Sequence, residues 1–463
     1  VNGTDLGERS PEAKNVYGMT LGGPVIKDKL FYFVNAEYEL KPTSISKWKL
    51  STDGVGHADQ MISRVTQADM DRFAAALGRY GYNPGTADLT NGDQTNAKVL
   101  ARVDWNISDR HNLMVRYNYT ENTSWNTPSN TSTVGAKAAS ARISDNAYVF
   151  RNNCYTIKDI AWSGVAELNS RIGDFMNNRL LVTASDVSNM RDSESEWFPH
   201  VDIWDGSGNA FMSAGYELFS NGTGNHVRTY DISDHFRWMV GRNIITAGLS
   251  YQYQKGATNY KMYGTSYYKY ASIEDFENGA APIAFGMTYP YDGVDDPASP
   301  TSFGQTAVFL QSETRFSNSF ALTYGVRADY LGYYEKLGTN ESFKALDWTD
   351  HYYANGTAPA GYSSPRIDTG MWPKSRVQVS PRVGFNWDVL GNENVVVRGG
   401  AGIFTGRTPL VFFTNVPNYS GMLQNTAMVT SDANGVLSGL AGNFLYTEAD
   451  LRNYLKNAGF ATV

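Results

Sequence analysis

One feature restricts the fold of this chain more than any other: apolar and polar residues alternate in six pairs of segments. A short turn joins the two segments of each pair. In residues 319–330, Leu322 and Val326 fall on one face, whereas Thr323 and Arg327 fall on the other. Successive side chains of a β-strand point to opposite faces of the sheet. We therefore expect strands with one face toward hydrocarbon and one face toward water, as in a membrane β-barrel.

The lengths of the connections give the predicted barrel an orientation. The short turns lie at residues 27–29, 108–110, 173–177, 240–243, 317–319 and 390–393. The predicted strand pairs are 15–26 with 30–40, 97–107 with 111–121, 158–172 with 178–189, 228–239 with 244–254, 303–316 with 320–332, and 377–389 with 394–405. Loops of roughly 35 to 55 residues separate these pairs, far longer than the connections of compact domains. Short turns on one side and long loops on the other indicate a periplasmic and an extracellular end.

Two of the long loops carry helix signals. Residues 41–96 are predicted to form a long extracellular loop with a short helix near 66–77, because Thr66 is followed by Asp69 three residues later. Residues 406–463 are predicted to form a loop region with a second short helix over 447–455. We expect both helices to be features of the loops rather than sites.

Aromatic residues are abundant, with 30 Tyr, 22 Phe and 10 Trp. A tilted barrel strand crosses the apolar band in about 9 to 11 residues. At that distance above their turns lie Tyr38, Tyr119, Tyr253 and Tyr330. Beside the turns lie Trp105, Phe175, Trp238, Phe316, Phe320 and Trp387. Two aromatic rows about one hydrocarbon thickness apart are typical of outer-membrane barrels.

A soluble all-β protein is the alternative, since its strands also alternate. It needs no regular exchange of short and long connections, and its strands average about five or six residues. The net charge of −7 is spread along the chain without a basic cluster, which argues against nucleic acid as a partner. Lipid is therefore the expected surroundings of the apolar faces.

Charged residues of both signs fall on the face predicted to line the lumen. Such a face can contact water in an open pore or a polar plug that fills the barrel. The predicted lumen-facing or plug-facing residues are Arg102, Asp104, Arg116, Glu313, Arg315, Arg327, Asp329, Arg382, Asp388 and Arg398.

One long loop is rich in tyrosine and offers weak candidates for substrate binding. Its rings can stack on sugars or peptides, or they can pack the loop against itself, and packing is the more frequent role. The tyrosines are Tyr260, Tyr263, Tyr267, Tyr268 and Tyr270.

The sequence shows no catalytic apparatus. No nucleophile motif or phosphate-binding glycine loop stands out, so we expect no enzyme and no cofactor. The six histidines are scattered without ligand spacing, so we expect no metal site.

The predicted strands number about twelve, and the last of them would leave an unpaired edge in lipid, where each unsatisfied backbone group costs several kcal/mol. Residues 1–9 contain neither a cationic start nor an apolar core, so no signal peptide is expected there. We therefore expect residues 1–463 to be a partial barrel, roughly half of a parent with about 22 strands.

Three motifs resemble TonB-dependent outer-membrane receptors of the Oar-like group of Bacteroidetes, whose members often carry a carboxypeptidase-regulatory-like domain. They are residues 15–33 (NVYGMTLGGPVIKDKLFYF), 380–388 (SPRVGFNWD) and 398–409 (RGGAGIFTGRTP). The resemblance is strongest at these motifs and weak in the loops. It implies a mainly β fold, with a transmembrane antiparallel barrel in the outer membrane of a Gram-negative cell.

The resemblance also implies a function: uptake of a large or scarce nutrient through a plugged barrel. The implied partners are outer-membrane lipid, a plug domain, the remaining strands of the parent protein, and TonB with ExbB and ExbD, which would act through an N-terminal region absent from this chain. The alternative is a passive porin-like channel or a surface adhesin. A plug domain encoded upstream of residue 1 would favour the receptor over this alternative.

Overall fold

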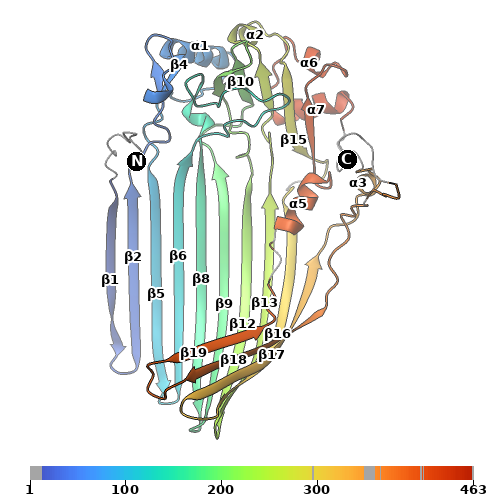
Figure 1. Cartoon of the computed structure of the whole chain (residues 1–463). Helices are drawn as coiled ribbons and strands as arrows, with labels where there is room; N and C mark the ends of the chain where they lie inside the picture. Colours follow the sequence, from blue (N-terminus) through green and yellow to red (C-terminus); the bar gives the residue numbers. More distant parts are fainter. Residues whose placement is uncertain are drawn as a thin grey trace.

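The computed structural model describes residues 13–294, 297–348, 360–364, 366–406, 409 and 411–460. Residues 1–9, where no signal peptide is expected, lie outside this part of the chain. Residues 407 and 408 of the third motif and residues 461–463 lie outside it as well. The described residues form a tall antiparallel sheet, here called the wall, and a compact layer of short strands and helices at one end (Figure 1). The second part, built from the long connections between the hairpins and from residues 411–460, is called the loop layer.

The wall contains twelve strands in strictly sequential order, each antiparallel to its neighbour. The strands are β1 (Asn15–Ile26), β2 (Leu30–Lys41), β5 (Gln94–Ser108), β6 (His111–Asn126), β8 (Tyr155–Ile172), β9 (Met176–Asp192), β12 (Gly224–Val240), β13 (Asn243–Asn259), β16 (Ser299–Arg315), β17 (Phe320–Glu335), β18 (Val377–Asp388) and β19 (Val396–Gly402). All six predicted hairpins are confirmed. Most strands are longer than predicted, because pairing continues past the apolar band toward the loop layer.

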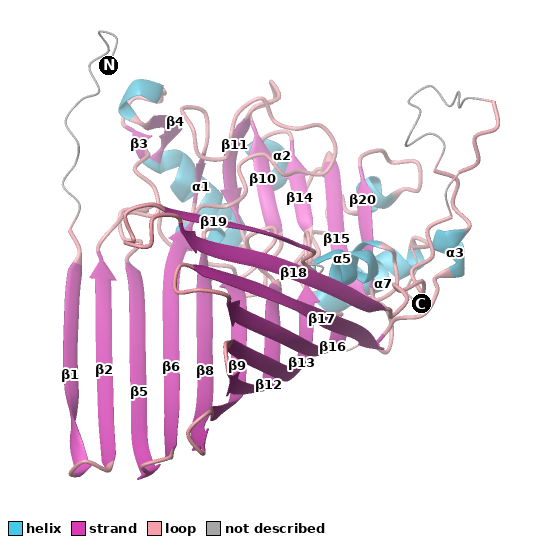
Figure 2. Ribbon diagram, turned by 60° about the horizontal axis from the view of Figure 1, so that its bottom comes forward, coloured by secondary structure: helices cyan, strands magenta, loops and turns pink. Residues whose placement is uncertain are grey.

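The wall is curved and open. Figure 2 shows β16 to β19 running obliquely to β1 and β2, so that the sheet forms a trough. Within the described residues, β1 pairs only with β2, and β19 pairs only with β18. Each of these two strands therefore presents a row of backbone groups without a β-partner.

The loop layer is built around a second sheet that crosses several connections. In spatial order its strands are β20 (Gln424–Val429), β15 (Ala284–Pro290), β14 (Tyr267–Tyr270), β10 (His200–Trp204), β11 (Ala210–Ala214) and β7 (Tyr148–Val149). A small parallel pair joins β3 (Lys49–Ser51) to β4 (Ile62–Thr66). The pairs β10–β14 and β11–β7 are also parallel, unlike any pair in the wall.

The loop layer also contains short helices. They are α1 (Gln67–Gly78), α2 (Ile273–Glu277), α3 (Glu341–Lys344), α5 (Val411–Tyr419), α6 (Val436–Gly439) and α7 (Glu448–Asn457), with 3₁₀ turns at Ala58–Gln60 and Arg151–Asn153. The predicted helices near 66–77 and 447–455 are confirmed as α1 and α7. At α1, the Thr66 side chain accepts from the Asp69 backbone and the Asp69 carboxylate accepts from the Thr66 backbone, which is a complete capping box.

The long connections are not the loosely packed surface segments that their composition indicates. They share a hydrophobic core that includes Met70 and Phe73 of α1, Phe198 before β10, and Phe285 of β15, all nearly or fully shielded from water. These residues are far apart in the sequence. A core of this kind depends on contacts that no local pattern reveals.

Candidate functional site

All ten charged residues predicted to line the lumen lie on one face of the wall. Residues directly opposite each other in an antiparallel pair share a face. Arg102 is opposite Arg116. When the pairing is followed from each strand to the next, Arg327, Arg382 and Arg398 fall on the same face as Arg102. We call this side of the sheet the polar face.

The polar face is the inner side of the trough. Phe413 of α5 contacts Tyr333 of β17 with 5.4 Å between ring centroids, and Tyr333 shares the polar face with Asp329. Ala307 on the same face is almost fully buried. Figure 2 shows α5 within the curve of the wall. The upper part of the polar face therefore already packs against protein.

The charges on this face form local ion pairs. Nη2 of Arg102 lies 2.7 Å from the Asp104 carboxylate, and Nη2 of Arg327 lies 2.9 Å from Asp329. A looser pair of 3.4 Å joins Arg315 to Glu313. Each pair joins residues two apart on one strand, since alternate side chains share a face. The guanidinium of Arg382 instead lies over the ring of Phe404, 4.6 Å from its centroid.

Four of the ten residues meet at the end of the wall that carries the short turns. Glu313, Arg315, Asp388 and Arg398 line a cavity of about 860 Å³ together with residues of three turns. We call it the turn-end cavity. The other predicted residues lie elsewhere on this face, so the structure brings the ten to one surface rather than to one point.

The opposite face is apolar. Leu310 is opposite Ala247 and Val326, and more than half of the Leu310 side chain is exposed, at 53%. The register also places on this face Tyr38, Tyr119, Tyr253 and Tyr330 toward the loop layer and Trp105, Trp238, Phe320 and Trp387 toward the turns. Exposed aliphatic side chains between two aromatic rows fit contact with lipid hydrocarbon.

The candidate tyrosines of the loop layer are mostly inaccessible. Tyr263, Tyr267, Tyr268 and Tyr270 are at most 2% exposed, and the Tyr260 ring packs against Tyr419 at 5.5 Å. Burial raises the pKa of Tyr263 to about 12. This arrangement favours the packing alternative over stacking on a bound substrate.

Tyr267 belongs to a buried polar network centred on Asp202 of β10. The Asp202 carboxylate accepts hydrogen bonds from Arg142 at 2.5 and 2.9 Å, from Tyr267 at 2.8 Å and from Ser213 at 2.6 Å, and it lies 3.0 Å from Nε2 of His200. Burial is the largest single influence and opposes the charged carboxylate, but the charges and hydrogen bonds of Arg142 and His200 together outweigh it and hold the pKa of Asp202 well below its usual range. Arg142 thereby fixes the irregular segment 127–147 to the sheet.

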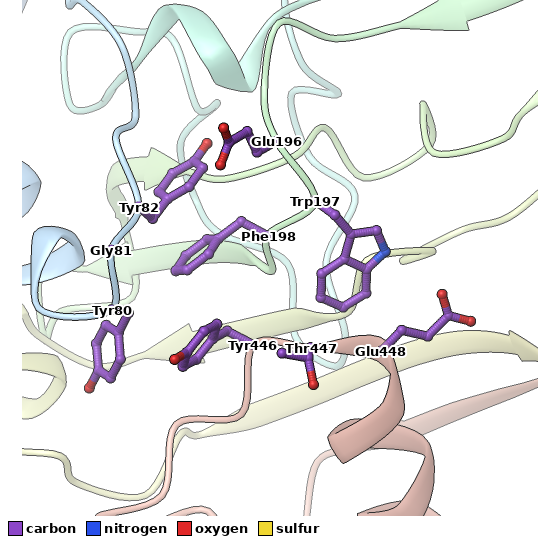
Figure 3. A pocket seen from close by; sticks show the side chains of 9 residues that line it. All are labelled: Tyr80, Gly81, Tyr82, Glu196, Trp197, Phe198, Tyr446, Thr447 and Glu448. Carbon is purple, nitrogen blue, oxygen red and sulfur yellow. The ribbon is translucent and has the colours of Figure 1, made fainter.

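A cleft on the loop layer, which the sequence did not indicate, brings aromatic rings and carboxylates together (Figure 3). Its volume is about 470 Å³. We call it the aromatic cleft, and its lining residues are Tyr80, Gly81, Tyr82, Glu196, Trp197, Phe198, Tyr446, Thr447 and Glu448. They come from three segments far apart in the chain, so no motif could have found them.

The sequence profile of outer-membrane β-barrel domains matches residues 53–462. This chain belongs to that family. As an outer-membrane β-barrel domain, it resides in the outer membrane, and its apolar face is the lipid-facing one. No curated protein matches the chain.

Solved structures of outer-membrane transporters and receptors align with this barrel domain. The outer membrane transporter YddB from Escherichia coli aligns with a TM-score of 0.54 and 11% identity, over 90% of this chain and 41% of that one. The siderophore receptor PirA from Acinetobacter baumannii aligns at 0.41 and 12%, over 84% and 40%. The ferric yersiniabactin uptake receptor FyuA from Yersinia pestis aligns at 0.41 and 8%, over 82% and 43%. The barrel domain therefore spans less than half the length of these proteins.

Among the described residues, no group of three or more His, Cys, Asp or Glu side chains is placed to hold a metal ion.

The helices of the barrel domain are short. None of those in the described part of the chain is long and apolar enough to cross a membrane.

Proposed function

We propose that this chain forms about half of the barrel of a TonB-dependent receptor, which takes up a large or scarce nutrient through a plugged lumen. In this proposal the plug rests on the polar face, and TonB with ExbB and ExbD supplies the energy for release. Motif resemblance supports membership of the Oar-like group of Bacteroidetes, which is part of the same proposal.

The observation that carries the proposal is the character of the polar face. It bears paired charges of both signs, it is concave, and its upper part already packs against α5. A protein plug needs such a surface, because buried charges are tolerated when they are paired and hydrogen-bonded. The turn-end cavity offers further polar surface near the periplasmic turns.

The open edges of the wall support a larger barrel. Backbone groups of β1 and β19 that face hydrocarbon without a partner would cost several kcal/mol each. Additional strands of the parent protein would pair with both edges and close the sheet. The loop layer, including residues 42–93 and 411–460, would then face the cell exterior.

A photo-crosslinking amino acid tests the plug directly, because neighbouring residues of one strand sample opposite faces. Gln311 lies on the polar face and Leu310 on the apolar face. With the crosslinker at position 311 of the full-length parent protein, produced in outer membranes, we expect a crosslink to an N-terminal plug of the same polypeptide. The matched substitution at position 310 should give lipid adducts only.

A passive channel gives a different result. The crosslinker at position 311 would capture no protein segment, and the purified protein would show steady conductance in planar bilayers. That pair of observations would replace the receptor by the porin-like alternative. An adhesin would capture no plug and conduct no steady current.

A further inference from the structure

The aromatic cleft is assembled from three segments of the loop layer. Tyr80 and Tyr82 follow α1, Trp197 and Phe198 precede β10, and Tyr446 precedes α7. The lining rests on the core of the loop layer, since Phe198 is 2% exposed and stacks on Tyr82 with 4.0 Å between parallel rings. The cleft is thus held in shape before any ligand arrives.

Above this floor the rings are accessible. Tyr446 is 41% exposed, and its centroid lies 6.2 Å from that of Phe198 and 5.9 Å from that of Tyr80. Trp197 is partly exposed, and Figure 3 shows its indole beside the same space as Phe198 and Tyr446. A ligand in the cleft therefore meets several aromatic faces at once.

The charges of the cleft are all negative. Glu196 and Glu448 are its charged lining residues, and no Lys or Arg lines it. Both carboxylates are exposed, and the described part of the chain gives that of Glu196 no ion pair or hydrogen bond. Glu448 lies 3.9 Å from Arg452, whose shorter ion pair, at 2.9 Å, is with Asp292.

We propose that the aromatic cleft binds an organic cation: an ammonium or guanidinium group on an aliphatic stem, such as the Lys or Arg side chain of a peptide. The faces of aromatic rings attract cations, and carboxylates attract them as well, so both features select the same ligand charge. An anionic ligand meets repulsion from both. The stem packs on Trp197 and Tyr446 while the charged head reaches Glu196. A volume of about 470 Å³ is in the range of ligand-binding pockets.

The binding site goes beyond the proposed function, because recognition of a cation at the outer surface does not require energised uptake. The test uses the protein purified from outer membranes in detergent micelles, with tri-lysine as the probe and isothermal titration calorimetry as the readout. Tri-lysine is used with an acetylated amino terminus and an amidated carboxyl terminus, so that its side chains carry its only charges. The same peptide with acetylated side chains is the matched neutral probe, since acetylation removes the charge and the cation–π donor. We expect tri-lysine to bind and the acetylated peptide to bind at least about tenfold more weakly.

Variants locate the binding. Glu196→Gln and Tyr446→Ala should each weaken tri-lysine binding about fivefold or more, a loss of about 1 kcal/mol. Asp59→Asn removes an exposed carboxylate of the loop layer outside the cleft and should leave binding unchanged. Tyr446→Ala also removes packing within the protein, so a second kind of variant is needed that leaves the packing intact. Glu196→Lys reverses a charge at the exposed rim of the cleft and should abolish binding.

Two results would overturn the proposal: equal affinity for the charged and acetylated peptides, or unchanged affinity in Glu196→Lys. Preferential binding of a neutral oligosaccharide would assign the cleft to sugars and also overturn it. These outcomes are independent of the crosslinking test, which reports on the plug. A failed plug crosslink with intact tri-lysine binding would remove the receptor proposal and leave the cleft.

Discussion

The wall and the loop layer place apolar side chains in opposite relations to the solvent. In the wall, residues such as Leu310 and Val326 point outward and remain exposed on the free protein, because lipid covers them in the membrane. In the loop layer, residues such as Phe73 and Phe285 point inward and are shielded by protein. The two regions also differ in where their charged side chains lie. The ten charges predicted to line the lumen lie on the concave polar face of the wall, whereas the loop layer buries Arg142 and Asp202 within its interior.

This contrast shows that one chain meets two physical demands. Inside a membrane, the backbone N–H and C=O groups of the wall must form hydrogen bonds within the protein. Pairing between neighbouring strands provides these hydrogen bonds locally. The loop layer must pack in water, where the hydrophobic effect rewards contacts between distant segments. The two regions should therefore respond differently to the same kinds of substitution.

The largest effect is expected from Arg142→Ala in the loop layer. The substitution leaves the Asp202 carboxylate buried without its main counter-charge, which costs about 3 to 5 kcal/mol. Hydrogen exchange in segment 127–147 should accelerate strongly, while exchange in the wall strands stays slow. Arg72→Ala is the control, because its ion pairs with Glu274 and Glu277 lie at the surface, where solvent screening leaves such pairs with little effect on stability. Similar exchange rates for the two variants would show that the network does not anchor the segment.

The next largest effect is expected in the wall, from Leu310→Arg. Arginine on the lipid face near the middle of the membrane costs about 2 to 4 kcal/mol. The adjacent change Gln311→Arg places the same charge on the polar face and should cost far less. Urea unfolding in lipid vesicles measures both. If the two variants unfold at the same urea concentration, the assignment of the two faces is wrong.

A smaller effect is expected at the start of α1. Thr66→Ala removes the capping side chain that accepts from the Asp69 backbone, at a cost of about 1 kcal/mol. Thr66→Ser keeps the hydroxyl and should retain most of the stability. Thermolysin cleavage of the loop layer, followed by mass spectrometry, reports the difference. Equal cleavage of the Ala and Ser variants would contradict a role for the cap.

The smallest effect is a pH dependence confined to the loop layer. Asp205 accepts hydrogen bonds from Asn209 and Ser207 and pairs with Arg64, and these partners outweigh burial and lower its pKa to about 2. A carboxyl with a depressed folded pKa contributes stability above its unfolded pKa near 4, and this contribution is lost as the pH falls toward 2. Asp205→Asn should therefore flatten part of the loss of loop-layer stability between pH 4 and 2. Proteolysis with an acid-stable protease checks this, and an unchanged slope would exclude Asp205 as the titrating group.

The wall was largely predictable from the sequence, and the site only in part. All six hairpins and both predicted helices were found, because alternation, turn residues and capping residues act over a few positions. The common face of Arg102, Arg116 and Arg382 also followed from alternation. The aromatic cleft did not, since Trp197 and Tyr446 meet through folding of three distant segments. The tyrosine-rich loop was open to two interpretations, of which the burial of its rings favours packing.

The sequence by itself determined that strands with one apolar and one polar face would alternate with short turns and long connections. That information is local, because each side chain's face depends only on its position along its own strand. Only the tertiary structure decided that the connections pack into a second layer with its own sheet, its buried Arg142–Asp202 pair and its cleft. The physical reason is that apolar side chains are buried by whichever residues lie near them in space. The order of residues along the chain does not show which distant segments come together.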